Sequence, residues 1–249
     1  MSKTVLITGA TSGIGKATAI LLASQGFSLI LCGRRKERLM ELEEELSTKT
    51  KVRTLSFDVR DRDKVFDTLK DIGEVDVLIN NAGNAHGLAP LHEGDVDDWE
   101  AMMDINVKGL LYVTKAISPG MVSRKSGHIV NIGSIAGKEA YPGGNVYCAS
   151  KHAVDAINNS LRMELHSYGI RVSAINPGLV ETEFSEVRFK GDTAKAQKVY
   201  DGFDPLTAQD IAETIAFVIT RPAHVNLSDI IIFPTAQAAS TMVHKEVSN

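Results

Sequence analysis

The chain has 249 residues, of which 43% are hydrophobic, and a formal net charge of −4. This length and apolar content suffice for a domain with a full core, and the slightly acidic balance excludes the basic surface typical of nucleic-acid-binding proteins. No apolar run approaches the ~20 residues that span a bilayer, so we also expect no membrane partner.

The N-terminal residues and the cysteines favour a cytoplasmic protein. The apolar run over residues 5–7 begins almost at the initiator and leads directly into a glycine-rich turn, which leaves no room for a signal peptide. Cys32 and Cys148 lie in different motifs, without His or Cys neighbours at metal-ligand spacing. This argues against a disulfide framework and against a bound metal.

A glycine-rich turn follows the first apolar run. Residues 4–8 predict a strand, a helical period runs from Ile14 to the stop at Gly26, and residues 28–32 predict the next strand. The glycines between strand and helix are spaced Gly-x-x-x-Gly-x-Gly, which lets a pyrophosphate approach the helix N-terminus without side chains in the way. An ordinary tight turn is the alternative. The residues that we expect around the pyrophosphate are Gly9, Thr11, Ser12, Gly13, Ile14 and Gly15.

The end of the second predicted strand indicates which cofactor is bound. An NAD-binding unit usually has an acidic residue there, roughly 20 residues past the glycines, to bond the ribose hydroxyls. This chain has Cys32-Gly33-Arg34-Arg35 instead, and guanidinium groups suit a 2′-phosphate. We therefore predict that Arg34 and Arg35 bind NADP, with NAD less favoured. The alternative is that both are the solvated first turn of the next helix, whose apolar stripe is Leu39, Leu42 and Leu46.

The next strands end in polar and small residues. Residues 52–57 predict a third strand and residues 75–79 a fourth, with a helix over residues 61–70 between them. Open α/β sheets bind ligands outside the carboxyl ends of their strands, so the residues that follow each strand are candidates for a cofactor crevice. Asp58 is placed for the adenine amino group, although Asx side chains are often caps or turn residues. The candidate contacts are Asp58, Val59, Asn80, Ala82 and Gly83.

A helical pattern between Asp95 and Lys125 contains an unexpected polar residue. The pattern divides into a short segment with Trp99 and a long apolar segment, and Asn106 lies near their junction. An uncharged polar side chain inside so apolar a run needs a hydrogen-bonding reason. A helix kink and a bound water are the reasons that the sequence leaves open.

Residues 131–151 can bring a hydroxyl, a phenol and an ammonium group into one pocket. The fifth predicted strand, residues 128–132, ends near Ser134, and a predicted helix begins at Tyr147. Lys151 lies one turn later on the same helix face. An adjacent cation favours the phenolate and pulls the phenol pKa from ~10 toward neutrality, which makes tyrosine a usable acid or base. Taken by itself, the Tyr-x-x-x-Lys pattern also fits the start of an ordinary amphipathic helix, which is the alternative.

Strands alternate with helices along most of the chain, and a sixth strand over residues 171–176 is closed by Pro177-Gly178. This alternation predicts an α/β fold, a Rossmann-like doubly wound parallel sheet of about seven strands with helices on both faces. We expect a single domain over residues 1–249. Residues 181–205 are polar and poorly periodic, which is typical of a lid that closes over a substrate.

With these residues in place, the chain resembles the short-chain dehydrogenase/reductase family. The match runs nearly end to end and rests on Thr8-Gly9-x-x-x-Gly13-x-Gly15, Asn80-Asn81-Ala82-Gly83, Asn106, Ser134, Tyr147-x-x-x-Lys151 and Pro177-Gly178. The resemblance implies that Ser134, Tyr147 and Lys151 are the catalytic set. It implies that Asn106 completes this set through a water relay. The further cofactor contacts that it implies are Tyr147, Lys151, Pro177, Gly178, Val180 and Thr182, of which Thr182 holds the nicotinamide amide.

Residues 182–192 and 233–237 are similar to a narrower group, the NADP-dependent 3-hydroxy acid dehydrogenases, also called serine or allo-threonine dehydrogenases. This resemblance implies oxidation of the 3-hydroxyl of serine, allo-threonine, 3-hydroxypropionate or 3-hydroxyisobutyrate, and reduction of related 3-oxo compounds. A hydroxy acid needs a partner for its carboxylate, and Arg188, with Phe184 nearby, can grip one with parallel hydrogen bonds. The alternative for Arg188 is a surface arginine on a mobile lid.

The predicted reaction is reversible hydride transfer between NADP(H) and the substrate carbon that bears the hydroxyl or carbonyl. Tyr147 takes the hydroxyl proton, Lys151 and the cationic nicotinamide lower its pKa, and Ser134 hydrogen-bonds the substrate oxygen. A broad carbonyl reductase or a 3-oxoacyl thioester reductase shares these residues, and a non-catalytic dinucleotide-binding sensor is the remote alternative. Family members are commonly tetramers built on two long helices, here those with Leu110 and Val154, so we expect a homotetramer.

Overall fold

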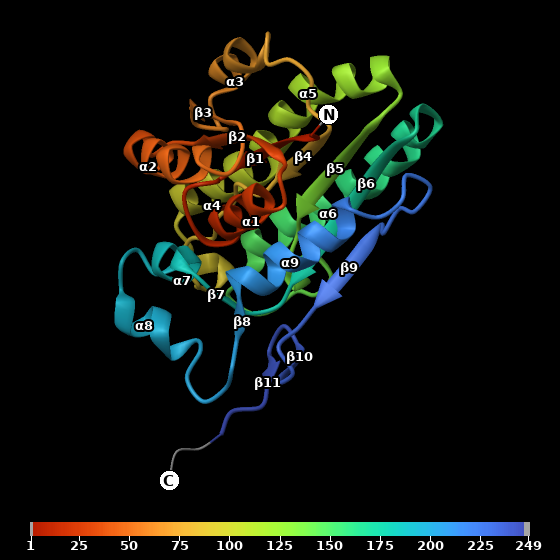
Figure 1. Ribbon diagram of the computed structural model, residues 1–249. Coiled ribbons are helices and arrows are strands. Elements are labelled where there is room, and N and C mark those ends of the chain that lie inside the picture. Colours follow the sequence, from red (N-terminus) through yellow and green to blue (C-terminus); the bar gives the residue numbers. More distant parts are fainter. Residues whose placement is uncertain (1, 247–249) are drawn as a thin grey trace.

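The computed structural model describes residues 2–246 and has a central parallel sheet with helices on both faces (Figure 1). The strands of this sheet are β1 (Thr4–Thr8), β2 (Ser28–Gly33), β3 (Val52–Ser56), β4 (Val77–Asn80), β5 (Gly127–Ile132), β6 (Ile170–Pro177) and β9 (Asp229–Ile232). They lie in the order β3-β2-β1-β4-β5-β6-β9, and every neighbouring pair is parallel. The predicted α/β fold with a seven-stranded doubly wound sheet is therefore confirmed.

Helices connect the strands. They are α1 (Gly13–Ser24), α2 (Lys36–Ser47), α3 (Arg62–Leu69), α4 (Val96–Met103), α5 (Leu110–Arg124), α6 (Asn145–Leu165), α7 (Glu183–Arg188), α8 (Thr193–Lys198) and α9 (Ala208–Ile219). Short 3₁₀ segments are η1 (Leu91–Glu93), η3 (Ile135–Gly137) and η4 (His166–Tyr168), while η2 (Asp104–Gly109) is π-helical. The remaining strands pair as β7 (Val180–Glu181) with β8 (Leu206–Thr207), and as β10 (Gln237–Ala239) with β11 (Met242–Val243).

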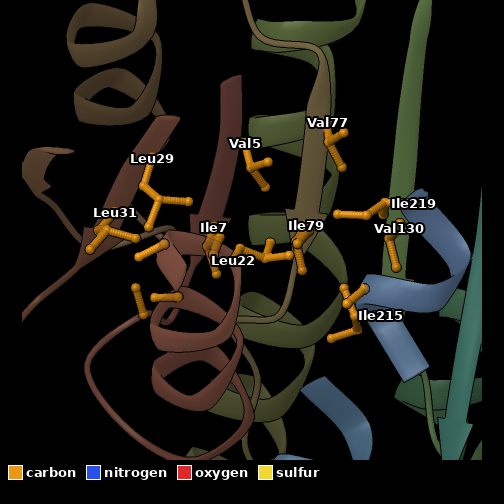
Figure 2. Packing of buried hydrophobic residues seen from close by; sticks show 14 of the residues in the cluster. Val5, Ile7, Leu22, Leu29, Leu31, Val77, Ile79, Val130, Ile215 and Ile219 are labelled. Atoms are coloured by element: carbon orange, nitrogen blue, oxygen red, sulfur yellow. The ribbon is translucent and has the colours of Figure 1, made fainter. Parts of the chain in front are cut away.

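The side chains of β1 are buried on both faces of the sheet. Val5 and Ile7 point toward α1, α2 and α9, and Figure 2 shows them in one cluster with Leu22 of α1 and Ile215 of α9. Leu6 points the other way, into the cluster covered by α3, α5 and α6. Successive strand residues face opposite sides of a sheet, so a strand covered on both faces is apolar at every position. This explains the unbroken apolar run at the start of the chain.

The strand order reverses at β1. The chain moves outward from β1 to β2 and β3, and then returns to place β4 on the other side of β1. At such a switch point the loops after neighbouring strands diverge and leave a crevice at their carboxyl ends. Figure 1 shows α7, α8 and the β10–β11 hairpin beyond these same strand ends. The predicted lid and the C-terminal hairpin therefore lie at the ligand-binding end of the sheet.

The segment predicted as an irregular lid contains helices. Thr182 caps α7, since its Oγ1 accepts a hydrogen bond from Phe184 N at 3.3 Å. Asp192 caps α8, since its Oδ1 accepts from Lys195 N at 3.0 Å. Each helix has only 6 residues, which is too short for the apolar period on which a sequence-based prediction depends.

Within residues 2–246, every helix is too short or too polar to cross a membrane. The same part of the chain contains no group of three or more His, Cys, Asp or Glu side chains able to hold a metal ion. The cytoplasmic location stays a prediction.

Candidate active site

A cavity of about 770 Å³ opens at the carboxyl ends of the central strands. Its wall combines the glycine turn, the end of β2, the segment after β4, the segment from β5 to α6, and α7. The predicted site residues that line it are Gly9, Thr11, Ser12, Gly13, Ile14, Arg34, Arg35, Asp58, Val59, Ala82, Gly83, Ser134, Tyr147, Lys151, Pro177, Gly178, Val180, Thr182 and Arg188. Those outside its lining are Gly15, Asn80 and Asn106.

The glycine turn between β1 and α1 has no room for side chains. Gly9 and Gly13 have φ angles of +65° and +49°, a region that favours glycine. A Cβ on Gly15 would lie 2.3 Å from the carbonyl oxygen of Gly9, so Gly15 lets α1 pack directly against the turn from behind the cavity wall. The first N–H groups of α1 are thereby presented over bare backbone, which suits a pyrophosphate.

Asn80 lies behind the cavity and not in its lining, and its contact with the cofactor stays a prediction. Its Nδ2 donates to Thr114 Oγ1 on α5 and to Asn131 Oδ1 on β5, each at 2.9 Å. Alternation along β4 turns this side chain toward α5, and the next residue, Asn81, lines the cavity instead. Asn81 Nδ2 donates to Gly9 O at 3.2 Å, which ties the end of β4 to the glycine turn.

Arg34 and Arg35 lie at the edge of the cavity where β2 ends. Arg34 Nη1 is 3.5 Å from Asp58 Oδ2, and Arg35 donates from Nε and Nη2 to Thr11 Oγ1 at 3.1 and 3.0 Å. Burial would raise the pKa of Asp58, but hydrogen bonds from Arg60 and the charges of Arg60 and Arg34 outweigh it and hold this pKa below its usual range. The Arg35 side chain thus points toward the glycine turn and is hydrogen-bonded to it. An arginine that is merely solvated would lack such a contact.

Ser134, Tyr147 and Lys151 meet on one wall of the cavity. Ser134 precedes η3, and its Oγ accepts a hydrogen bond from Ala136 N at 3.1 Å. Tyr147 lies in the first turn of α6 with 8% of its surface exposed, and Lys151 follows one turn later. Lys151 Nζ donates to Ile132 O at 2.9 Å, which anchors the ammonium group at the end of β5. A hydroxyl, a phenol and an ammonium group therefore share one pocket.

The protein alone does not bring the Tyr147 phenol to a neutral pKa. Burial raises the pKa of Tyr147 to about 12, although a hydrogen bond with Ser134 and the charge of Arg188 act in the opposite direction. Burial also lowers the pKa of Lys151 to about 8, because the ammonium group loses its water. The predicted shift toward neutrality is wrong for the protein by itself, since it counted the charge of Lys151 but not the burial of both groups.

A chain of polar contacts holds the Ser134 segment from behind. Ser134 N donates to Asn176 Oδ1 at 3.3 Å, and Asn176 Nδ2 donates to Asp229 Oδ1 on β9 at 2.6 Å. Lys138 Nζ bridges Asp229 and Asp155 of α6, at 2.8 and 2.5 Å. The segment that carries the serine is thereby tied to β6, β9 and α6.

Asn106 lies in the π-helical turn η2 and braces the segment after β4. Its Oδ1 accepts from Asn84 N at 2.8 Å, and its Nδ2 donates to Asn84 O at 2.8 Å and to Ser150 Oγ at 3.0 Å. The sequence left a helix kink and a bound water as reasons for a polar residue at this position. The structure shows a helix irregularity, because the helix widens at Asn106 into a π-helical turn. The water relay stays a prediction.

Arg188, at the end of α7, reaches into the cavity beside Tyr147. Its Cζ lies 5.0 Å from the centroid of the Tyr147 ring and 5.9 Å from those of Tyr141 and Phe184. Its Nη2 donates to Tyr141 Oη at 2.7 Å, and its buried Nε has no hydrogen-bond partner among residues 2–246. Tyr141 is a site residue that the sequence-based prediction missed, although its place between Ser134 and Tyr147 was a usable signal.

Comparison with known protein families identifies the family to which the chain belongs. A family model described as short chain dehydrogenase matches residues 3–193. The chain belongs to this family. The membership predicted from the motifs is therefore confirmed, and the chain is an enzyme of the short-chain dehydrogenase type.

Individual relatives of this short-chain dehydrogenase match over nearly the full length. The chain is 47% identical over 247 residues to the NADP-dependent 3-hydroxy acid dehydrogenase of Salmonella typhi, covering 97% of this chain and 99% of the relative. It is 46% identical over 245 residues to sulfoacetaldehyde reductase 2 of Chromohalobacter salexigens, covering 96% and 97%. The closed form of serine dehydrogenase complexed with NADP+ has a TM-score of 0.91 at 45% identity, covering 98% of this chain and 100% of that structure. The predicted similarity to the 3-hydroxy acid dehydrogenases is confirmed.

The buried ammonium of Lys151 destabilises this dehydrogenase. We expect Lys151→Met to raise the free energy of unfolding at pH 7 by about 2 kcal/mol, even though the hydrogen bond to Ile132 O is lost. The pKa of Lys151 is about 8 in the folded protein, and its ordinary value is 10.5. Between pH 8 and pH 10.5 the unfolded protein therefore binds more protons than the folded one. The stability of the wild type rises with pH over this range.

Urea unfolding of both proteins at pH 7 and pH 10 measures this effect. The advantage of Lys151→Met should be complete below pH 8, where the folded protein carries the full charge, and should shrink as pH rises toward 10.5. An advantage of equal size at both pH values would contradict the assignment of a strained, buried ammonium group.

Proposed function

We propose that the chain is an NADP-dependent dehydrogenase of small 3-hydroxy acids, which oxidises the 3-hydroxyl reversibly to a 3-oxo group. The observation that carries this proposal is the position of Arg188, whose Cζ lies 5.0 Å from the Tyr147 ring centroid. The ring that carries the proton acceptor, Tyr147, thus lies beside a cation that can bind a carboxylate, Arg188. In a short hydroxy acid the hydroxyl and the carboxylate are separated by a similarly small distance. Relatives named NADP-dependent 3-hydroxy acid dehydrogenase and serine dehydrogenase support the same substrate class.

The residues of the cofactor groove fit NADP. The glycine turn would hold the pyrophosphate, Arg34 and Arg35 the 2′-phosphate, and Asp58 the adenine amino group, while no carboxylate directly follows β2. Thr182, at the start of α7, would hold the nicotinamide amide. When bound, NADP+ accepts the hydride. The other proposed contacts, which line the groove between these points, are Val59, Ala82, Gly83, Pro177, Gly178 and Val180.

The side chains of the protein handle the proton and the substrate oxygen. In oxidation, Tyr147 accepts the hydroxyl proton, and in reduction it returns a proton to the carbonyl oxygen. Ser134 donates a hydrogen bond to that oxygen as its charge changes. Because burial raises the pKa of Tyr147 to about 12 even beside the charge of Arg188, the phenolate would need further positive charge, a role that we assign to Lys151 and to the oxidised nicotinamide when NADP+ is bound.

Arg188 is the proposed partner of the substrate carboxylate. Its Nε is buried without a partner among residues 2–246, and its Nη2 is shared with Tyr141. A carboxylate that accepts from Nε and Nη2 together would satisfy both nitrogens with parallel, charge-assisted bonds. The rings of Tyr141, Tyr147 and Phe184 keep water away from the guanidinium, which strengthens such a pair.

A substrate panel tests the proposed function. Serine, allo-threonine, 3-hydroxypropionate and 3-hydroxyisobutyrate should be oxidised with NADP+ at a kcat/KM about 100-fold above that with NAD+, since a phosphate–guanidinium contact is lost with NAD+. Neutral alcohols of the same length, which lack the carboxylate, should react far more slowly. A strong preference for NAD+, or equal rates for acids and neutral alcohols, would contradict the proposal.

A short sulfonated aldehyde is the second candidate substrate. Sulfoacetaldehyde reductase 2 is 46% identical to this chain, and a sulfonate offers oxygens to the same guanidinium as a carboxylate does. A broad carbonyl reductase or a 3-oxoacyl thioester reductase would share the catalytic residues but would have no use for an anion partner beside Tyr147. Adding sulfoacetaldehyde and a 3-oxoacyl thioester to the panel separates these possibilities.

We also propose that residues 181–205 close over the substrate and that four copies assemble. Contacts that fasten the segment support a lid: Gly87 N donates to Arg188 O at 2.9 Å, and Lys190 Nζ is 3.0 Å from Asp98 Oδ2.

Exposed apolar side chains on the long helices support an assembly, with Leu111 of α5 42% exposed and Met163 of α6 62% exposed.

A further inference from the structure

The lid helix α7 is tied by ion pairs to the arginines that follow β2. Glu183, the first residue of α7, accepts from Arg35 Nη1 at 3.0 Å and from Arg38 Nη1 at 2.8 Å. Burial would raise the pKa of Glu183, but hydrogen bonds from both arginines and their charges hold it below its usual range, so the group is a carboxylate. One end of the proposed lid therefore rests on the corner of the cavity where β2 ends.

The contacts of Arg35 divide its guanidinium into two sides. Nε and Nη2 form one edge, and both donate to Thr11 Oγ1 of the glycine turn, at 3.1 and 3.0 Å. Nη1 lies on the other side and donates to Glu183 Oε2. A phosphate group takes an arginine edge with two parallel N–H bonds. Because Glu183 holds Nη1, the Nε–Nη2 edge faces Thr11 in the lining of the groove, where a phosphate would take this edge in place of the threonine hydroxyl.

We propose that Glu183 is a positioning residue that sets the preference for NADP over NAD: from the lid, it orients Arg35 toward the 2′-phosphate and couples that phosphate to lid closure. This inference rests on the proposed assignment of Arg35 to the 2′-phosphate. Coupling between two sites is reciprocal, so a lid that improves 2′-phosphate binding is itself held closed by that phosphate.

A carboxylate near a phosphate repels it. The charges around Glu183 decide whether its orienting effect on Arg35 outweighs this repulsion. Arg38 offsets the charge of Glu183, and the second edge of Arg35 is bonded to the neutral Thr11 hydroxyl, which a phosphate could replace. The side chains of Arg35, Arg38 and Glu183 are 41%, 46% and 44% exposed, so water and salt screen the repulsion. Screening also weakens the Arg35–Glu183 ion pair, but the hydrogen bond at 3.0 Å still limits the side-chain freedom that Arg35 loses when the phosphate binds.

Equilibrium binding without substrate tests the proposal. Calorimetric titration gives the Kd of NADP+, of NAD+ and of 2′,5′-ADP, a fragment that carries the 2′-phosphate but no nicotinamide. Glu183→Gln should raise the Kd of NADP+ and 2′,5′-ADP about tenfold and leave that of NAD+ within about twofold. Unchanged or tighter NADP+ binding in Glu183→Gln would overturn the proposal, since the carboxylate would then be a bystander or a competitor of the phosphate.

Lys190→Met is the matched control for a general loosening of the lid. Lys190 pairs with Asp95 and Asp98 at 3.2 and 3.0 Å, at the other end of α7 from Glu183. This variant should leave the ratio of the NADP+ and NAD+ dissociation constants unchanged. A rise of the NADP+ to NAD+ ratio as large as in Glu183→Gln would overturn the specific role of Glu183.

Arg35→Leu separates the failure of this inference from that of the arginine assignment. If Arg35→Leu leaves NADP+ binding unchanged, Arg35 does not bind the 2′-phosphate and both proposals fall. If Arg35→Leu weakens NADP+ binding and Glu183→Gln does not, only the role of Glu183 falls. In the double variant, Glu183→Gln should add nothing to the effect of Arg35→Leu, because it acts through that guanidinium.

Discussion

A Tyr147→Phe variant is expected to turn over hydroxy acids about 10³-fold more slowly than the wild type, while its Kd for NADP+ stays within about twofold. The reason is that the substitution removes only the hydroxyl. The phenylalanine ring keeps its packing against Phe184, at a centroid distance of 5.7 Å, and its place beside Arg188. Proton transfer is lost, and the shape of the cavity is retained. Steady-state rates and calorimetric titration with NADP+ measure the two effects separately.

Tyr141→Phe is the matched control for this experiment. It removes a second phenol hydroxyl from the same cavity, one that accepts a hydrogen bond from Arg188 Nη2 at 2.7 Å. Because Tyr141 contacts the proposed carboxylate partner, this variant should raise the KM for hydroxy acids several-fold and change kcat little. Near-normal turnover by Tyr147→Phe, or an equal loss of kcat in both variants, would refute Tyr147 as the proton carrier.

The fold could be predicted because several local patterns in the chain, each ambiguous alone, agree on one arrangement. The apolar run over residues 5–7 is buried on both faces of the sheet, as an interior parallel strand requires. Gly15 is needed because a Cβ there would lie 2.3 Å from Gly9 O, so the turn and the helix after it are specified together. The short helices of the proposed lid were not predicted, since hydrogen bonds from backbone N–H groups to caps such as Thr182 define them, and these leave no periodic signal.

The types and spacing of the proposed catalytic residues were visible in the sequence, but their environment was not. The four-residue spacing of Tyr147 and Lys151 places them one turn apart, whereas the burial that raises one pKa and lowers the other depends on the packed structure. Partners far apart in the chain are equally hidden: Arg35 and Glu183 are 148 positions apart. The direction of the Asn80 side chain, toward Thr114 and Asn131, was hidden as well, because it depends on where β4 ends and strand ends are the least certain part of a sequence-based prediction.

Arg188→Leu is expected to raise the KM for 3-hydroxy acids about 100-fold, which corresponds to the loss of a buried, charge-assisted pair with a carboxylate. The kcat/KM for a neutral alcohol of the same length should stay within about threefold. This contrast is expected because leucine keeps the apolar contact with the surrounding rings and removes the guanidinium, whose Cζ lies 5.0 Å from the Tyr147 centroid. Steady-state kinetics with the acid and alcohol pair under saturating NADP+ gives the measurement.

Further variants distinguish a carboxylate clamp from a lid contact. Arg188→Lys keeps the charge but loses the parallel pair of N–H donors, so its KM for hydroxy acids should lie between those of the wild type and Arg188→Leu. Glu186→Gln changes an exposed charge on the same helix, outside the cavity lining, and should leave the KM unchanged. If Arg188→Leu impairs acids and neutral alcohols equally, Arg188 acts by holding α7 over the site, and the hydroxy acid preference must arise from another group. If only the acids are affected, the guanidinium of Arg188, which lies beside the Tyr147 phenol, selects the substrate. Proton transfer and substrate specificity then both depend on closure of the same lid.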